Sequence, residues 1–485
     1  MTKELRRLSI LMLIMFLALF ASTSWIQAVQ AESLSADPAN KRALYDSYEV
    51  QRGSIVAGGD PIATSVASDD VYTWKRVYTD AEMWAPVTGY INPVLGAATG
   101  IEQAMNQQLS GLGGSQFLSR IDRILSGKSP RGSNVVLSLE PDIQKVAYDA
   151  LGDLQGAVVA IEPDTGRILA MVTSPSYDTN LLAVHDADAV NEVHDALEED
   201  STHPLYNRAI AGDLNPPAST FKLVVASAAL ASGEWTPEST LPNPARYTLP
   251  DTTTQVSNSS GSTCGTGDEV SIADALRLSC NIPFAELAVE LGDDVIRAEA
   301  EKYGFNSAFT MPLVSTPSVY PQVLDDARTA LGGFGQGDVR ATPLQMAMVA
   351  AGIANGGTVM NPMMVDQVIG PDLSVQQTYE PSEFSQALSP ELAAELTELM
   401  VANVSDGVAS NARIDGVEVA GKTGTGENGD DAPYTLWFTG FAPADNPQVA
   451  VAVVVEDGGG QGQSGFGNTI AAPIAKKVME AVLKR

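Results

Sequence analysis

The segment around Ser219 and Lys222 constrains the fold of this chain more than any other short stretch. Between Phe221 and Leu230 the only charged residue is Lys222, and the rest are mostly apolar or small, which predicts a helix buried on all sides. Two prolines directly before this segment cannot lie inside a helix and mark its start. A separation of three residues places Ser219 and Lys222 about one turn apart on the same face. We therefore expect a buried helix whose first turn carries Ser219.

A lysine in a helix that is buried on all sides requires a physical explanation. Burying an isolated ammonium group is costly unless the group is paired or has a chemical task. Desolvation lowers the pKa of a lysine, so a buried Lys222 could accept the proton of the Ser219 hydroxyl. The pair alone is weak support, because a serine three residues before a lysine occurs by chance several times in a chain of 485 residues.

Two further motifs follow in the order that a single acyl-transfer site requires. The tripeptide Ser279-Cys280-Asn281 comes first, and the KTGTG segment at 422–426 comes later. An alternating run at 417–420 precedes KTGTG and predicts a strand that ends at a glycine-flanked edge, where backbone N–H groups could meet a substrate. Together the three motifs predict one active site for acyl transfer.

These motifs resemble the SxxK, SxN and KTG motifs of the penicillin-interacting serine transferases, which include penicillin-binding proteins, serine β-lactamases and β-lactam sensors. The chain is also similar to their transpeptidase domain at 156–172 (GAVVAIEPDTGRILAMV) and 175–178, at 335–337 and 341–347, and at 438–443 (FTGFAP). Residues 51–55 (QRGSI) and 99–102 (TGIE) are similar to the pedestal of class B penicillin-binding proteins, in particular the shorter actinobacterial type A enzymes. The resemblance therefore covers nearly the whole chain.

The resemblance implies an α+β fold, in which an antiparallel sheet flanked by helices forms the transpeptidase domain. A smaller mixed N-terminal pedestal and one N-terminal transmembrane helix accompany it. The composition shifts place the anchor at 1–31, the pedestal at 32–154 and the transpeptidase domain at 155–485. Within the last, strands are expected at 156–162, 167–172 and 449–455, with a helix at 470–483.

The implied activity is D-alanyl-D-alanine transpeptidation, which crosslinks peptidoglycan stem peptides and is inhibited covalently by β-lactams. Ser219 would form the acyl-enzyme, and Lys222 would accept its proton. Ser279 and Asn281 would bridge to Lys222, and Ser279 would pass a proton to the leaving D-alanine. Lys422 would supply positive potential. The substrate would meet KTGTG at Thr423, Gly424 and Thr425, and the backbone N–H groups of Ser219 and Thr425 would form the oxyanion hole.

Other members of the same superfamily use this site differently. A D,D-carboxypeptidase or a β-lactam hydrolase would release the acyl group to water, and a β-lactam sensor or scaffold would keep it. No separate glutamate motif for deacylation is recognisable, and a sensor would normally bring several membrane spans. The sequence therefore favours the crosslinking transpeptidase over these alternatives.

Two unrelated kinds of site are disfavoured by their context. The segment from Gly416 to Thr423 satisfies the Walker A spacing, but it is strand-like, and the residues after it are a poor helix start. The three histidines, His185, His194 and His203, all precede Ser219 in an acidic stretch, and no GxSxG elbow is present. Their spacing also fits no zinc site. We expect no metal and no cofactor.

Composition bounds the setting of the protein. The chain is 44% hydrophobic and 18% charged, which is typical of globular domains. Its formal net charge of −31 argues against binding nucleic acid, because neutralising phosphates requires basic patches.

The N-terminus predicts a membrane anchor. Lys3, Arg6 and Arg7 precede an apolar run from Leu8 to about Ala28, roughly 20 residues, which is long enough to cross a bilayer. Positive charge before the run predicts a cytoplasmic N-terminus and an extracytoplasmic catalytic domain at the cell membrane. A cleaved signal peptide ending at 29–31 is the alternative. The absence of a recognisable glycosyltransferase segment leaves glycan polymerisation to a partner, and the resemblance suggests a membrane polymerase of the SEDS family.

The two cysteines, Cys264 and Cys280, are candidates for a disulfide in an exported chain. They lie 16 positions apart, and a bridge closing such a loop would stabilise the fold by about 3 kcal/mol. Because Cys280 is the middle residue of the SxN motif, the bridge would tether the loop at 257–268 beside the active site. One buried and one exposed free thiol is the alternative.

Overall fold

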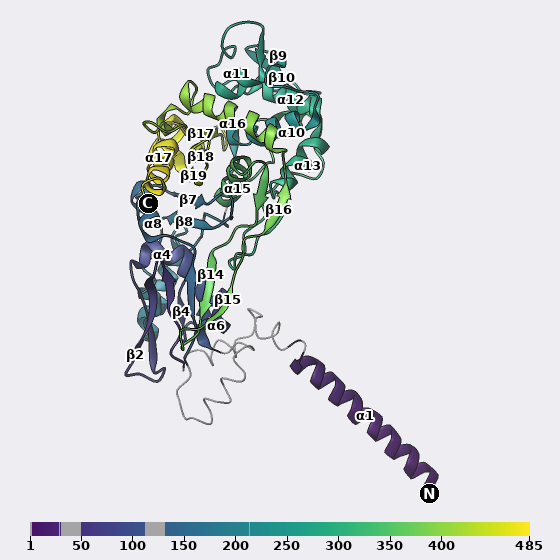
Figure 1. Ribbon diagram of the computed structural model, residues 1–485, viewed down its shortest axis with the longest axis vertical. Coiled ribbons are helices and arrows are strands. Elements are labelled where there is room, and N and C mark those ends of the chain that lie inside the picture. Colours follow the sequence, from purple (N-terminus) through teal and green to yellow (C-terminus); the bar gives the residue numbers. More distant parts are fainter. Residues whose placement is uncertain (1, 29, 31–49, 112–130, 213) are drawn as a thin grey trace.

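The computed structural model describes residues 2–28, 30, 50–111, 131–212 and 214–485 (Figure 1). Two sheets organise the body of the molecule, one in the lower part of the view and one in the upper part. Helix α1 (Thr2–Ala28) stands apart from this body. The mixture of a largely antiparallel sheet architecture with packed helices confirms the predicted α+β class.

The upper sheet has five antiparallel strands in the order β17-β18-β19-β7-β8. Its central strand reads VAVAVVV and is buried along its whole length, because helices cover both faces of the sheet. The predicted strands near 156–162, 167–172 and 449–455 are confirmed. The bounds are β7 (Gly156–Ile161), β8 (Ile168–Ser174), β17 (Ala420–Gly426), β18 (Thr435–Ala442) and β19 (Val449–Val455).

Two layers of helices enclose this sheet. Helices α8 (Pro141–Leu151) and α17 (Ala471–Val482) pack against one face, where Val158, Val453 and Val478 share a buried cluster. Helix α15 (Pro343–Ala354) packs against the other face, beneath α10 (Lys222–Ser232) and α16 (Pro390–Ser405). The helix predicted at 470–483 is confirmed as α17. Apolar burial between these layers is the main stabilising contribution to the domain.

The lower sheet has six strands in the order β15-β14-β6-β1-β2-β3, and it joins two distant parts of the sequence. Strand β6 pairs in parallel with β1 and antiparallel with β14. The hairpin of β14 and β15 thus extends from the upper half of the molecule into the pedestal sheet (Figure 1). The bounds are β1 (Ile55–Ala57), β2 (Asp60–Ala67), β3 (Trp74–Tyr78), β6 (Asn134–Leu137), β14 (Val365–Ile369) and β15 (Val375–Thr378).

The remaining elements are four two-stranded sheets, further helices and 3₁₀ turns. The two-stranded sheets pair β4 (Ile91–Asn92) with β5 (Ala97–Ala98), β9 (Thr240–Pro242) with β12 (Glu269–Ser271), β10 (Arg246–Thr248) with β11 (Gln255–Ser257), and β13 (Thr358–Met360) with β16 (Glu383–Gln386). The other helices are α4 (Ala81–Thr88), α5 (Gly100–Ala104), α6 (Asn106–Ser110), α9 (Ala187–Glu199), α11 (Ile272–Arg277), α12 (Ile282–Leu291), α13 (Asp293–Lys302) and α14 (Asp326–Gly332). Single 3₁₀ turns are η2 (Leu181–Ala183), η3 (Ala218–Thr220), η4 (Ser410–Ala412), η5 (Asp457–Gly460) and η6 (Gly462–Ser464).

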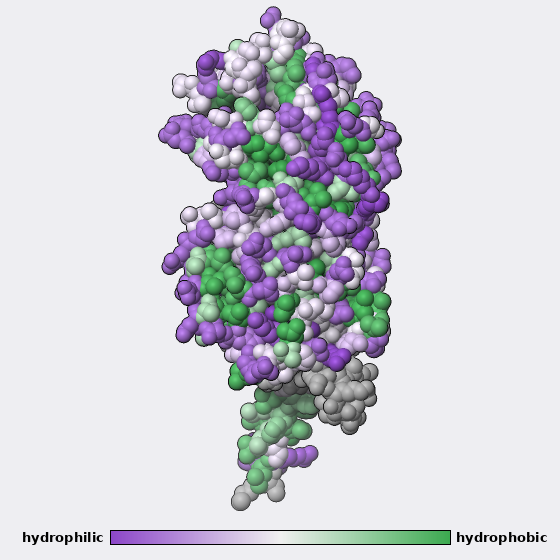
Figure 2. Space-filling view, turned by 90° about the vertical axis from the view of Figure 1, so that its left-hand side faces the viewer, coloured by the Kyte–Doolittle hydropathy of each residue, from purple (hydrophilic) through white to green (hydrophobic). Residues whose placement is uncertain are grey.

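Helix α1 has the length and composition of a membrane span. Between Lys3 and Ile26 it contains a window of 18 residues that is apolar enough to cross a membrane, and this window is unburied. Figure 2 shows it at the lower end, covered mostly by hydrophobic side chains, whereas the face of the body in this view mixes hydrophilic and hydrophobic side chains. The alternative cleavage site at 29–31 and the boundary at 31 fall at residues that lie, except for Gln30, outside the described part of the chain.

A buried ion cluster lies inside the pedestal. Arg52 and Arg76 both bond the carboxylate of Glu102, and all three side chains are almost completely buried. Burial alone would raise the pKa of Glu102, but the charges and hydrogen bonds of Arg76 and Arg52 outweigh it, so the pKa lies below its usual value. The QRGSI and TGIE segments of the sequence therefore meet at this cluster, through the bond between Arg52 and Glu102.

Replacing Glu102 should destabilise the protein strongly. The variant Glu102→Ala leaves two buried guanidinium groups without their carboxylate, which typically costs about 3–5 kcal/mol. Asp149→Ala is the matched control, since its partnership with Lys145 is solvent-exposed and should cost less than about 1 kcal/mol. Urea unfolding followed by circular dichroism measures both. Equal losses in the two variants would contradict a structural role for the cluster.

Candidate active site

Ser219 lies in a sharp turn directly before the buried helix. The turn is a 3₁₀ segment, η3, and the α-helix α10 begins at Lys222, so Ser219 precedes the helix by one turn instead of lying within it. In a 3₁₀ turn side chains three residues apart eclipse each other, so the expected approach of Ser219 and Lys222 is kept. Ala218, just before the serine, has a left-handed φ of 51°. The backbone is therefore bent sharply at the serine.

Lys222 is the centre of the site. Its Nζ lies 3.0 Å from Ser219 Oγ, and it donates to the Asn281 Oδ1 at 2.9 Å and to the Ser279 carbonyl oxygen at 2.9 Å. The side chain is fully buried, with the ring of Phe284 5.7 Å from Nζ. The structure thus gathers the first two motifs around one amine.

Ser279 and Asn281 come from the short connection between α11 and α12. Ser279 has a left-handed φ of 60°, which turns its carbonyl oxygen toward Lys222 and allows its hydroxyl to meet the third motif. Its Oγ accepts a hydrogen bond from Lys422 Nζ at 2.7 Å. The predicted bridge to Lys222 is therefore made by the Asn281 side chain and the Ser279 backbone, while the Ser279 hydroxyl contacts Lys422.

The KTGTG segment forms an edge strand of the upper sheet. Strand β17 begins at Ala420 and includes the whole motif, so the strand predicted at 417–420 in fact starts where the prediction ended. Thr425 Oγ1 accepts a hydrogen bond from the backbone N–H of Gly467 at 3.3 Å. Thr423 is buried, and Thr425 is partly exposed. The lysine of the Walker A spacing lies inside β17, and a loop and strand β18 follow that strand, which is the wrong context for a P-loop.

Burial sets the charge state of the two lysines. Desolvation lowers the pKa of Lys222 well below its usual value, and the charge of nearby Lys422 lowers it further. Desolvation also lowers the pKa of Lys422, to about 7. The site can therefore hold one neutral amine beside Ser219 and one charged amine beside Ser279.

Glycines let the serine turn approach β17 closely. A side-chain carbon at Gly424 would lie 3.0 Å from the Pro217 carbonyl oxygen, and one at Gly335 would lie 2.0 Å from the Ala218 carbonyl oxygen. Gly335 also has a φ of 75° and accepts a hydrogen bond from the Ala218 N–H at 2.9 Å. The packing of the turn that carries the nucleophile therefore requires a glycine at position 335, and it leaves little space for a side chain at position 424.

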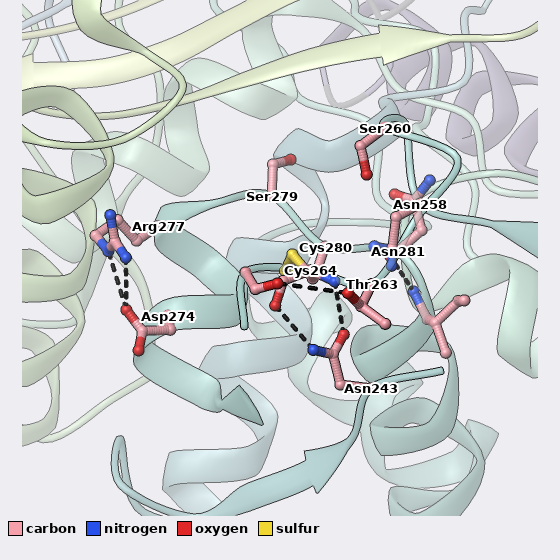
Figure 3. Close-up of a disulfide and its surroundings, with 12 residues drawn as sticks. Asn243, Asn258, Ser260, Thr263, Cys264, Asp274, Arg277, Ser279, Cys280 and Asn281 are labelled. Atoms are coloured by element: carbon pink, nitrogen blue, oxygen red, sulfur yellow. Dashed lines mark hydrogen bonds and ion pairs between the residues drawn. A yellow bond between two sulfur atoms is a disulfide. The ribbon is translucent and has the colours of Figure 1, made fainter. Parts of the chain in front are cut away.

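The disulfide joins the SxN motif to the loop beside it. Cys264 and Cys280 are bonded, with Cα atoms 5.8 Å apart (Figure 3). Asn243 holds the Cys264 backbone on both sides, since it accepts from the Cys264 N–H at 2.8 Å and donates to its carbonyl oxygen at 2.9 Å. The loop at 257–268 is thereby fixed against the start of α12.

Some residues of the site carried no usable signal in the sequence. Asn258 bonds the backbone of Asn281, and the ring of Phe284 lies near Lys222, yet each lies in a segment without a recognisable motif of its own. An asparagine in a stretch rich in serine predicts only a turn. Contacts of this kind follow from the tertiary fold and not from local spacing.

Each of the three histidines has a partner outside the three motifs. His185 bonds Asp70 of the pedestal, His194 lies on α9 near Glu198, and His203 stacks on Tyr206. Within the described residues, no group of three or more histidine, cysteine and acidic side chains has the arrangement of a metal site. Lys222 is left as the basic group nearest Ser219.

Two family comparisons divide the chain between them. Residues 156–480 match the family described as "Penicillin binding protein transpeptidase domain", and residues 52–135 match the "Penicillin binding protein A dimerisation domain". The chain is 41% identical to the peptidoglycan D,D-transpeptidase PbpA of Mycolicibacterium smegmatis, covering 100% of this chain and 99% of the relative. It is 40% identical to PbpA of Mycobacterium tuberculosis with the same coverage.

Solved structures agree with these relatives. The ceftriaxone acyl-enzyme complex of penicillin-binding protein A from M. tuberculosis superposes with a TM-score of 0.87 at 41% identity, covering 90% of this chain and all of that one. The penicillin G acyl-enzyme complex of that protein gives a TM-score of 0.84 at 40% identity, with the same coverage. In that relative, therefore, β-lactams form a covalent acyl-enzyme, and its fold is similar to that of this chain.

Replacing Gly335 tests the packing of the serine turn. Gly335→Ala adds both a left-handed alanine and a collision with Ala218, so we expect a loss of stability well above 1 kcal/mol and slower covalent labelling by a fluorescent penicillin. Gly233→Ala is the matched control. It has a similar φ of 71° but open space around the new methyl group, so it should cost about 1 kcal/mol and leave labelling unchanged. Identical effects would contradict the buttressing role of Gly335.

Proposed function

Because this chain belongs to the penicillin-binding protein transpeptidase family, we propose that it crosslinks peptidoglycan stem peptides through an acyl-enzyme on Ser219. The observation that carries the assignment of residues is the 3.0 Å approach of the buried Lys222 amine to Ser219 Oγ. A neutral amine at this distance is within reach of the hydroxyl proton. The protein is a serine-type D,D-transpeptidase, and β-lactams are its covalent inhibitors.

In the first half-reaction Ser219 Oγ attacks the carbonyl carbon of the penultimate D-alanine, and Lys222 Nζ takes the hydroxyl proton. The bond between Oγ and carbon forms, and the amide bond to the terminal D-alanine breaks. The departing amine needs a proton, which the Ser279 hydroxyl delivers. Lys422, which donates to that hydroxyl at 2.7 Å, replaces the proton. Terminal D-alanine then leaves, and an acyl-enzyme remains.

Substrate binding falls to the edge strand β17. The Thr423 and Thr425 hydroxyls hold the terminal carboxylate of the stem peptide, and the charge of Lys422 attracts it. The close approach of Gly424 to the serine turn brings these groups beside Ser219. The backbone N–H groups of Ser219 and Thr425 form the oxyanion hole, where one lost donor costs about 2.7–4 kcal/mol of transition-state stabilisation.

In the second half-reaction an amine from a neighbouring stem peptide attacks the acyl carbon. The amide bond forms and the bond to Ser219 Oγ breaks. The proton of the attacking amine passes through Ser279 to Lys422, and Lys222 returns to Ser219 Oγ the proton that it took in the first half-reaction. Attack by water would instead make the protein a carboxypeptidase or a β-lactam hydrolase. Retention of the acyl group would make it a sensor or scaffold. These outcomes differ only in the fate of one intermediate, so they are separated by experiment.

The side of the membrane on which the reaction takes place is inferred from α1. The helix is long and apolar enough to span a membrane, and Lys3, Arg6 and Arg7 near its start favour a cytoplasmic N-terminus. The anchor at 1–31, the pedestal at 32–154 and the transpeptidase domain at 155–485 then lie in order from the inside to the outside of the cell. The pedestal and anchor are the surfaces we propose for contact with a SEDS-family glycan polymerase.

A fluorescent penicillin tests the assignment of the nucleophile. The protein should acquire a persistent covalent label, Ser219→Ala should acquire none, and the control Ser232→Ala, at the exposed end of the same helix, should label like the wild type. Incubation with a stem peptide ending in D-alanyl-D-alanine and an acceptor amine, followed by mass spectrometry, should yield the amide-linked dimer. Rapid loss of label, or release of free acid alone, would indicate a hydrolase.

The second-order rate of penicillin acylation should depend on pH in a bell shape. The rate rises as Lys222 loses its proton, because only the neutral amine can act as a base. It falls as Lys422 loses its proton, at a pKa of about 7 in the free enzyme. Lys422→Arg is the control, since a guanidinium stays charged and the alkaline limb should disappear. A wild-type rate that keeps rising well above pH 7 would contradict this assignment.

A further inference from the structure

Asn258 lies outside the SxN motif but binds the backbone of that motif directly. It follows strand β11, and its side chain is buried. Its Oδ1 accepts two hydrogen bonds, from the backbone N–H of Asn281 at 2.8 Å and from that of Ile282 at 3.0 Å. Its Nδ2 donates to the Ser262 carbonyl oxygen at 3.0 Å. One side chain thus joins the loop at 257–268 to the start of α12.

These bonds replace the N-cap that α12 lacks. Asn281 occupies the N-cap position, but its side chain makes no capping bond, because it is turned toward Lys222 instead. The first N–H groups of a helix need acceptors from elsewhere. Asn258 Oδ1 supplies such an acceptor, so the Asn281 side chain can accept the hydrogen bond from Lys222 instead.

The same loop also orients the Asn281 amide. Its Nδ2 donates to the Ser257 carbonyl oxygen at 3.1 Å, and its Oδ1 accepts from Lys222 Nζ at 2.9 Å. Since the amide has one oxygen and one nitrogen, holding the nitrogen at Ser257 points the oxygen at Lys222. Figure 3 shows Asn258 and Asn281 side by side, next to the disulfide.

The loop needs restraint, because its sequence is rich in serine, threonine and glycine and would be costly to order. Two devices hold it. The bond between Cys264 and Cys280 ties its far end to the SxN motif, and Asn243 fixes the Cys264 backbone and donates to the Gly267 carbonyl oxygen at 3.1 Å. The loop is therefore tied at Asn258 and at Cys264, on both sides of its exposed middle.

We propose that Asn258, in a loop held by the Cys264–Cys280 bridge, is a positioning residue for acyl transfer that acts by fixing Asn281 against Lys222. This inference rests on the proposed function and adds a residue that does not touch substrate. Asn258 sets the position of the Asn281 backbone, Ser257 sets the direction of its amide, and the amide oxygen sets the position of the catalytic amine.

A double-mutant cycle tests the proposal on the full chain. The probe is a fluorescent penicillin, and the readout is the second-order acylation rate of Asn258→Ala, Asn281→Ala and the double variant. We expect Asn258→Ala to slow acylation by about tenfold. The double variant should be no slower than Asn281→Ala within about twofold, because Asn258 acts through Asn281. Effects that multiply, or a wild-type rate in Asn258→Ala, would overturn the proposal.

The pH profile separates positioning from a loss of stability. A carbonyl acceptor favours the ammonium form of Lys222, so its displacement should move the acid limb of acylation to lower pH in Asn258→Ala and Asn281→Ala alike. Lys422 also faces Lys222, and none of these variants changes it. Ser260→Ala, an exposed serine in the same loop, is the control and should match the wild type. An unmoved acid limb in Asn258→Ala would overturn the proposal.

Removal of the disulfide provides a second test of the proposal, which can still be carried out if Asn258→Ala does not fold. Cys264→Ser with Cys280→Ser should slow acylation and show the same non-additivity with Asn281→Ala. A wild-type rate in this pair would overturn the role of the bridge. The failure of the proposed function is distinguishable, because it would appear as absence of a Ser219-dependent label in the wild type, before any variant is compared.

Discussion

The site depends on one costly interaction, the complete burial of the Lys222 amine. A buried lysine loses its proton readily, and that loss is what allows it to act as a base toward Ser219. The cost is tolerated because three oxygens surround the amine, from Ser219, Ser279 and Asn281. These oxygens come from two separate segments of the chain, the serine turn and the connection between α11 and α12. The fold can therefore be understood as the means of bringing those segments to one nitrogen atom.

Convergence of the segments requires close backbone approach, which explains the positions of two glycines. The serine turn lies between Gly424 on strand β17 and Gly335 beyond α14, and a methyl group at either would press on Pro217 or Ala218. The edge position of β17 in the upper sheet leaves its outer side open to the serine turn. Sheet, turn and helix thus constrain one another. A small displacement of any of them would move Ser219 relative to Lys222 and reduce its reactivity.

Much of the fold and most of the motif geometry could be predicted from the sequence. The buried strand β19 and the helix α10 carry long apolar runs, and such runs specify their own burial. The hairpin of β14 and β15 could not be predicted in the same way. Its strands carry a weak hydrophobic pattern, with β15 wholly exposed, and its partner β6 lies more than 200 residues earlier. The bounds of β17 were also predicted wrongly. Its sequence alternates glycine and threonine and therefore lacks the hydrophobic pattern of a strand, although the serine turn packs against it.

Asn258 shows why the supporting residues of a site are harder to predict than its motifs. A motif residue is defined by its chemistry and by spacing along one helix or strand, and both can be read from the sequence. The effect of Asn258 depends instead on a loop that returns to Asn281 after 23 residues, and the Cys264–Cys280 bridge determines that path. Substituting Asn281 would remove an atom that Lys222 needs, whereas substituting Asn258 would leave that atom present but free to turn away. Catalysis by a buried amine depends on the second condition as much as on the first, because a misdirected amide would present its own N–H donors to Lys222 in place of an acceptor.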